Sequence, residues 1–231
     1  MLPLREHDKV VQQNPNSADA YFHRGKAKMP DLSAIADYDD AIRLNPNFAE
    51  AYYYRGCMKS YFGSGESTPA ARYKALLSAV ADFDNAIRLD LDFPELLSAY
   101  YRRGLAKYNI DRYEDAIDDF DAALMLKQGD PECLIAEIQE LREEAEGILN
   151  FYEEGIANIN ERIRENPVNI RDYKIRGETN GFLGRMEEAV ADFKRILELT
   201  SEQQIISEIE KHLQQLENTY YWQQYSWRTG N

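Results

Sequence analysis

Cysteine and histidine are scarce in this chain. Its 231 residues include two cysteines and three histidines. Cys57 and Cys133 lie far apart in the sequence, which gives no disulfide framework and predicts free thiols in a reducing cytosol. None of the histidines has a cysteine, serine or acidic cluster near it at the spacing of a metal site or a catalytic triad: His7, His23 and His212. We therefore predict a cytoplasmic protein that is not an enzyme and needs no metal or cofactor.

Long apolar runs and an excess of basic residues are also missing. No stretch of about 18 apolar residues occurs, and no apolar segment precedes a small-residue cleavage site near the N-terminus, so we expect neither a membrane partner nor a secretory signal. The chain has 27 Lys and Arg against 41 Asp and Glu, a formal net charge of −14. Nucleic-acid-binding proteins carry a basic stripe, and its absence argues against such a partner.

The acidic residues are unevenly distributed. Residues 129–165 contain eleven Asp or Glu against three Arg, a net charge of −8 for that segment. Such a run can be a solvated helix face or part of a binding surface. The direction in which the carboxylates point decides between the two.

What the chain has in abundance is internal repetition. A first block reads aromatic-x-x-Arg-Gly, and a second reads Ala-[Ile/Val]-x-Asp-[Phe/Tyr]. The first block ends at Gly25, Gly56, Gly104 and Gly177, and the second begins at Ala34, Ala79, Ala116 and Ala189. The paired blocks recur at an average spacing of about 34–40 residues, which is the period of a helix-turn-helix solenoid. In such an array each repeat contacts only its neighbours, so the chain offers a long surface instead of a central pocket.

Each block has the spacing of a helix. In the first, the aromatic residue lies four positions before the glycine, which places both on one stripe. A glycine inside a helix costs about 1 kcal/mol relative to alanine, so four of them indicate a close backbone approach. Prolines end the helices at Pro46 and Pro167.

These motifs resemble the tetratricopeptide repeat family from about residue 16 to residue 225. The resemblance implies an all-α protein in which antiparallel helix pairs stack into a right-handed superhelix whose concave face binds peptides. We predict one solenoid domain over residues 1–231, with a helix of a truncated leading unit at 4–14. The repeats are expected at about 16–47, 48–92, 95–129, 130–167 and 168–200, with a capping helix at 201–225.

Two repeats depart from the pattern. The second contains about eleven additional residues around GSGESTPAARYK, which we expect to form a flexible connection. Thr68 and Pro69 are typical of a helix start, so its second helix should run from there to about Leu89. The fourth is a degenerate helix pair in which Glu143 replaces the glycine.

An arginine precedes each glycine, and an aspartate precedes each aromatic residue of the second block. These residues could form a row of charged ligand contacts or a row of structural ion pairs, and we favour the second interpretation. The expected pairs, here called the Arg–Asp ladder, are Arg24 with Asp37, Arg55 with Asp82, Arg103 with Asp119, and Arg176 with Asp192. Buried pairs of this kind fix stacking geometry more than they add net stability.

The positions six and three before the glycine, and one and four after it, share a helix face that we call the groove face. The resemblance places this face on the concave surface. We predict a peptide groove with an aromatic trough, acidic lips and a carboxylate wall, formed by Asp19, Phe22, Lys26, Glu50, Tyr53, Tyr101, Leu105, Tyr108, Glu137, Glu140, Glu144 and Lys174. Phe22, Tyr53 and Tyr101 could instead be packing residues. A clamp for acidic chaperone tails is rejected because only Arg102 has the required character.

We therefore predict a non-catalytic scaffold or adaptor. Its partner is expected to be a protein or peptide with apolar or aromatic anchors and with Lys or Arg near the carboxylate wall. The alternative is a structural or self-assembling protein, because five aromatic residues fall within residues 220–227 and could form a homo-oligomer through residues 218–227.

Overall fold

The computed structural model describes residues 3–89, 94–126 and 131–229, with side chains as far as Leu216. Over these residues it consists of 11 α-helices and contains no strand. The prediction of an all-α fold is therefore confirmed. None of the helices described is both long and apolar enough to span a membrane.

The chain divides into two compact units. The first is Met1–Ile110 with Glu114–Glu143, and the second is Asp111–Tyr113 with Glu144–Asn231. The first unit contains α1 (Leu4–Gln13), α2 (Ala18–Lys28), α3 (Ala34–Leu44), α4 (Ala49–Ser64), α5 (Pro69–Leu89), α6 (Leu96–Tyr108) and nearly all of α7 (Tyr113–Met125). The second contains α9 (Ile170–Phe182), α10 (Met186–Leu199) and α11 (Gln203–Thr229), and α8 (Glu132–Glu165) contributes to both.

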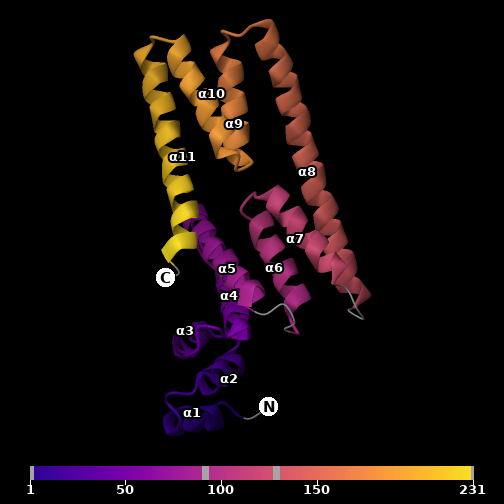
Figure 1. The fold of residues 1–231 in the computed structure, drawn as a ribbon, viewed down its shortest axis with the longest axis vertical. Coiled ribbons are helices and arrows are strands. Elements are labelled where there is room, and N and C mark those ends of the chain that lie inside the picture. The colour runs from indigo at the N-terminus through magenta and orange to yellow at the C-terminus, as the bar shows by residue number, and fades with distance from the viewer. Residues whose placement is uncertain (1–2, 90–93, 127–130, 230–231) are drawn as a thin grey trace. The chain divides into compact units, whose positions relative to one another are not determined.

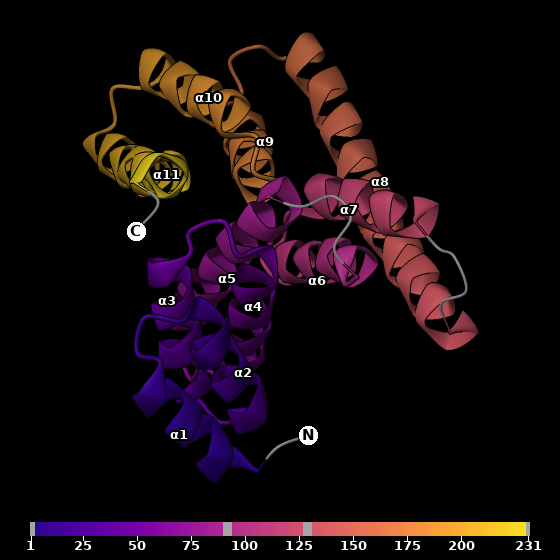
Figure 2. The same cartoon turned by 60° about the horizontal axis from the view of Figure 1, so that its bottom comes forward.

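In the first unit, consecutive helices pack side by side from α1 to α6 (Figure 2). The predicted pairs are present as α2 with α3, α4 with α5, and α6 with α7. Helix α1 packs on α2, as expected for the second helix of a leading unit. Each pair buries the aromatic residue of its second helix completely: Tyr38, Phe83 and Phe120.

Close approach of the two helices explains the repeated glycine. A Cβ atom on Gly104 would lie 2.9 Å from the ring of Phe120, closer than real Cβ contacts. The same clash would occur at Gly25 with Tyr38 and at Gly56 with Phe83. The missing side chain lets the ring lie directly against the first helix, so the expected close approach is confirmed.

The second repeat uses its additional residues to lengthen both helices. Helix α4 continues to Ser64 and α5 begins at Pro69, so only residues 65–68 connect them. Most of the segment around GSGESTPAARYK, which we expected to form a flexible connection, is therefore helical, because small residues let the helices continue together: a Cβ on Gly63 would lie 2.6 Å from Ala75. The helix start at Thr68 is confirmed, since its Oγ1 accepts a hydrogen bond from the Ala71 amide at 3.2 Å.

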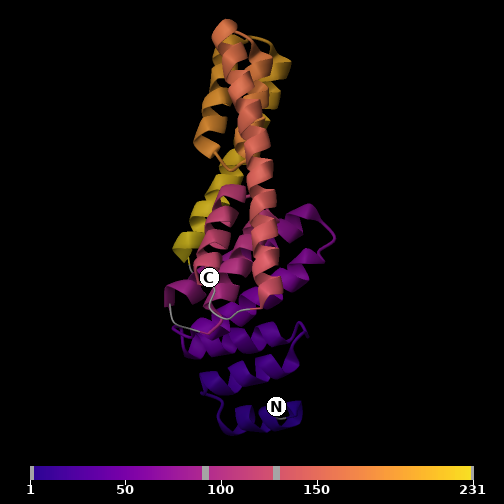
Figure 3. The ribbon, with the colours of Figure 1, turned by 90° about the vertical axis from the view of Figure 1, so that its right-hand side faces the viewer.

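The fourth repeat is not a helix pair. Residues Glu132–Glu165 form one continuous helix of 34 residues, α8, which Figure 3 shows as an unbroken coil. The predicted turn is absent because the middle of this segment has no proline and is rich in helix-forming residues. Its mid-helix break signals are two isolated glycines, Gly147 and Gly155, which a long helix tolerates.

The second unit contains the last helix pair and its cover. Helices α9, α10 and α11 lie side by side (Figure 1), and α11 places Ile205, Ile209, Leu213 and Leu216 against the core around Phe193. The prediction of a terminal helix near 201–225 that covers the last pair is therefore confirmed. The aromatic side chains of residues 220–227 lie outside the described residues.

Candidate functional site

The Arg–Asp ladder is present in all four repeats. Arg24 Nη2 lies 2.6 Å from Asp37, Arg55 Nη2 lies 2.5 Å from Asp82, and Arg176 Nη2 lies 2.6 Å from Asp192. Arg103 pairs with Asp119 in the same way. The four aspartates are only 2–3% exposed, so a ligand cannot reach them from solvent. These contacts support the structural interpretation of the ladder and not the charged ligand row.

Three of the four aspartates also bind a lysine one helical turn after the arginine. The lysine Nζ lies 2.7 Å from Asp37 in the first repeat, 2.8 Å from Asp82 in the second and 2.8 Å from Asp119 in the third. The lysines are Lys28, Lys59 and Lys107. Sequence reasoning missed them, although their spacing of four residues from the arginine is visible in the sequence.

Each ladder arginine also contacts the preceding helix layer. Arg55 Nη1 lies 2.7 Å from Asp39, and Arg103 Nη1 lies 2.6 Å from Asp84. Arg24 approaches Asp8 on α1 at 3.5 Å, and Arg176 donates to the side-chain oxygen of Asn160 on α8. A single guanidinium therefore joins the two helices of its own repeat to the repeat before it. The planar fork of arginine supports such a bridge better than a lysine ammonium does.

The three rings predicted as an open aromatic trough are buried. Phe22 is 7% exposed, Tyr53 is 6% exposed and Tyr101 is 8% exposed. Each belongs to a core cluster with the aromatic residue of its second helix. The three rings are therefore packing residues of their repeats, and little of their surface remains for a ligand.

Around Phe22, the partly accessible side chains are Lys26 on the groove face and Tyr54 beside it. The Lys26 ammonium lies 4.4 Å from the centroid of the Tyr54 ring and 5.5 Å from that of Phe22, as a cation above the ring faces. The Tyr54 hydroxyl donates to Glu95 at 3.0 Å and so connects α4 to the start of α6. Tyr54 and Glu95 were not in the predicted groove.

Next to Tyr53 lie the thiol of Cys57, on the groove face, and the guanidinium of Arg102, beside that face. Burial raises the pKa of Cys57 to about 11. The positive charge of Arg102 favours the ionised forms of Cys57 and Tyr53 and so opposes the larger effect of burial on their pKa values. The Arg102 side chain itself is exposed. The middle of the groove face is therefore positively charged, which the predicted aromatic trough did not include.

Helix α8 supplies carboxylates to the first unit. The Tyr101 hydroxyl donates to Glu137 at 2.6 Å, and burial together with this hydrogen bond raises the pKa of Tyr101. Glu137 and Glu140 are exposed. Among the residues that the structure describes, no cation pairs with Glu140. Glu140 therefore presents a free negative charge one turn from the Tyr101–Glu137 contact.

The other predicted groove residues have varied surroundings. Asp19 is exposed, Glu50 is half-buried, and Leu105 and Tyr108 are partly buried against the core around Phe120. In the second unit, Glu144 is exposed, and Lys174 lies 2.6 Å from Glu208 on α11, which raises the pKa of Lys174. Lys174 is therefore engaged by the covering helix. The described part of the chain contains no group of His, Cys, Asp or Glu that could hold a metal ion.

Comparison with known proteins gives the following similarities. Two models of the tetratricopeptide repeat family match, one over residues 76–131 and one over residues 175–203. No curated protein matches. The crystal structure of YrrB, described as a TPR protein with an unusual peptide-binding site, has a TM-score of 0.50 at 16% identity and covers 89% of this chain and 97% of that chain.

Two further solved structures are similar at lower scores. TTC0263, a thermophilic TPR protein from Thermus thermophilus, has a TM-score of 0.46 at 12% identity, over 92% of this chain and 88% of that chain. MamA from Desulfovibrio magneticus RS-1 has a TM-score of 0.46 at 20% identity, over 79% of this chain and 94% of that chain. At these identities, the similarity to YrrB is one of fold.

Proposed function

Because the chain is a tetratricopeptide repeat protein, we propose that it is a non-catalytic scaffold that binds a partner peptide along the groove face of its first unit. Tetratricopeptide repeat proteins are generally non-enzymatic modules for protein interaction. The observation that supports this site is the position of the remaining charge. The Arg–Asp ladder pairs its own charges inside the repeats, whereas Lys26 and Glu140 on the groove face, and Arg102 beside it, stay accessible.

The groove face favours a peptide with two kinds of side chain. The half-buried ring of Tyr54 suits an apolar or aromatic anchor. The free carboxylate of Glu140, beside Glu137, suits Lys or Arg. Lys26 and Arg102 repel basic residues elsewhere along the face, so the basic residues should gather at the end of the peptide near α8.

A peptide selection tests this proposal. A displayed random library is selected on the wild-type protein and then on E140K, with D118K as the matched control. Asp118 is exposed on α7, a second helix of a repeat, so D118K makes the same change of charge away from the groove face. We expect wild type and D118K to select apolar or aromatic peptides with Lys or Arg, and E140K to lose the basic preference. Acidic peptides, or the same peptides from all three proteins, would contradict the proposal.

The alternative, self-assembly through residues 218–227, stays a prediction. Helix α11 continues to Thr229, past its core contact at Leu216. Light scattering after size exclusion separates the two functions. A dimer that is lost when residues 218–231 are removed would favour self-assembly, and a monomer before and after removal would oppose it.

A further inference from the structure

The last repeat lacks one cation that the first three repeats share. In those, a lysine four residues after the ladder arginine lies 2.7–2.8 Å from the second carboxylate oxygen of the buried aspartate. In the last repeat the corresponding residue is Asn180, which is 5% exposed. An asparagine side chain is shorter than a lysine side chain, so the place of the lysine ammonium is left open.

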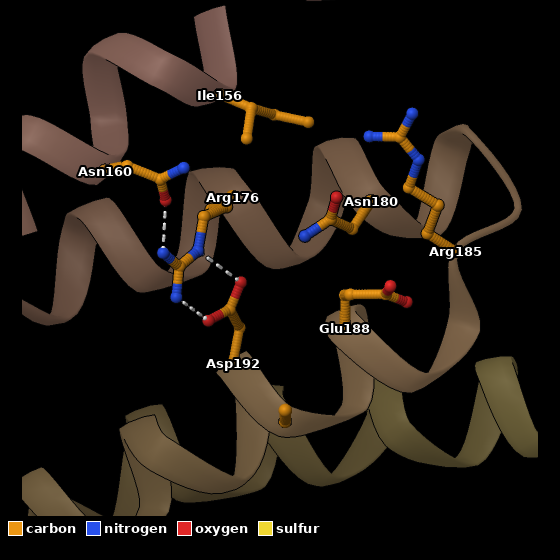
Figure 4. Close-up of a pocket in the computed structure, with 8 residues that line it drawn as sticks. Ile156, Asn160, Arg176, Asn180, Arg185, Glu188 and Asp192 are labelled. Atoms are coloured by element: carbon orange, nitrogen blue, oxygen red, sulfur yellow. Dashed lines mark hydrogen bonds and ion pairs between the residues drawn. The ribbon is translucent and has the colours of Figure 1, made fainter. Parts of the chain in front are cut away.

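A pocket lies at this place, within the second unit. Its volume is about 400 Å³, and Figure 4 shows that α8, α9 and α10 line it. Asn180 comes from α9, the carboxylates of Asp192 and Glu188 come from the neighbouring α10 (Figure 4), and Ile156 and Ala191 supply apolar surface. In the first three repeats a lysine of the chain itself takes the equivalent place beside the aspartate.

The two arginines at the pocket are already neutralised. Arg176 donates to both oxygens of Asp192, at 2.9 Å and 2.6 Å, and to Asn160 (Figure 4). Arg185 pairs with Glu153. Glu188 is exposed, and with Asn180 it provides oxygen atoms that can accept hydrogen bonds. The pocket therefore favours a cation with an aliphatic stem over an anion.

We propose that this pocket binds a primary ammonium group on an aliphatic chain, namely the lysine side chain of a partner protein. The ammonium takes the place of the missing lysine, between Glu188 and the Asn180 oxygen and next to the Asp192 carboxylate that Arg176 shares. Its methylene groups lie against Ile156 and Ala191. The pocket is separate from the groove face of the first unit, so the proposal does not depend on the peptide site proposed there.

A titration followed by NMR tests the proposal. The probe is Nα-acetyl-lysine N-methylamide, and the control is Nα-acetyl-norleucine N-methylamide, which has a similar aliphatic stem without the ammonium. A single side chain should bind with a Kd on the order of 1 mM. We expect saturable shifts of the Asn180 side-chain amide and the Ile156 methyl signals with the lysine probe alone. An absence of saturable shifts, or equal shifts with both probes, overturns the proposal.

Three variants locate the binding. N180K restores the lysine of the other repeats and should abolish the shifts while raising Tm. E188Q should weaken binding about three- to tenfold at unchanged Tm, because charge-assisted hydrogen bonds are stronger than neutral ones. E187Q changes an exposed neighbour outside the pocket lining and should have no effect. Unchanged shifts of the Ile156 methyl signals in N180K overturn the proposal. If N180K does not fold, a Kd for E188Q equal to that of the wild type overturns it.

Discussion

A buried aspartate determines the chemistry around it in each repeat. Moving a carboxylate out of water costs several kcal/mol unless it is paired and hydrogen-bonded. Asp37, Asp82 and Asp119 each receive an arginine and a lysine, and each arginine continues to a partner in the layer before it. The ladder therefore fixes how the repeats stack and is a structural element, not a ligand site.

Removal of one ladder carboxylate should destabilise the protein. D119A leaves Arg103 and Lys107 without their buried partner, and Arg103 is only 16% exposed at its side chain. We expect the free energy of unfolding to fall by about 3–5 kcal/mol in a urea titration. D118A, one residue away and exposed, should change it by less than about 0.5 kcal/mol. An unchanged midpoint in D119A together with lost peptide binding would assign the ladder to the ligand instead.

The two cysteines should differ in reactivity. Burial raises the pKa of Cys57 to about 11, so near pH 8 only about one molecule in a thousand carries the thiolate that attacks a disulfide reagent. Cys133 is exposed. C133S, which retains Cys57, should label slowly when native, faster as pH rises toward 11 and fast when unfolded, whereas C57S should label fast in both states. Equal native rates for the two variants would contradict the burial of Cys57.

At the scale of the helices, some features were predictable and others were not. Thr68 and Pro69 are a strong helix start, and α5 begins there. The ladder followed from the recurrence of Arg and Asp in the same four repeats. The continuity of α8 did not follow, because the stripes at Ile138 and Ile159 look the same whether a turn or more helix joins them. Packing of the groove-face rings was one of two interpretations left open by the sequence, since spacing assigns a face but not the neighbour that covers it.

Two glycine substitutions should act in opposite directions. A Cβ on Gly147, within α8, meets nothing within 4 Å, so G147A should stabilise the protein by about 0.5–1 kcal/mol through helix propensity alone. A Cβ on Gly104 would clash with Phe120, so G104A should destabilise it by about 1–3 kcal/mol. Thermal unfolding followed by circular dichroism measures both. A destabilised G147A would indicate that α8 is interrupted there.

For the molecule as a whole, net charge determines how a partner approaches. The formal charge of −14 attracts basic segments over distances near the Debye length, and this attraction acts mostly on the association rate. The repeat fold distributes binding over a surface and needs no enclosed reactive centre. The ladder is internally paired, so selectivity should depend on the exposed charges of the groove face.

The most direct test of the account is the affinity of one selected peptide for three proteins. Fluorescence anisotropy gives its Kd for wild type, E140K and D118K at about 50 mM and about 300 mM salt. We expect E140K to bind about tenfold more weakly at low salt, with the difference shrinking at high salt, while D118K changes the Kd by less than about twofold. Equal Kd values for E140K and D118K at low salt would contradict peptide binding on the groove face.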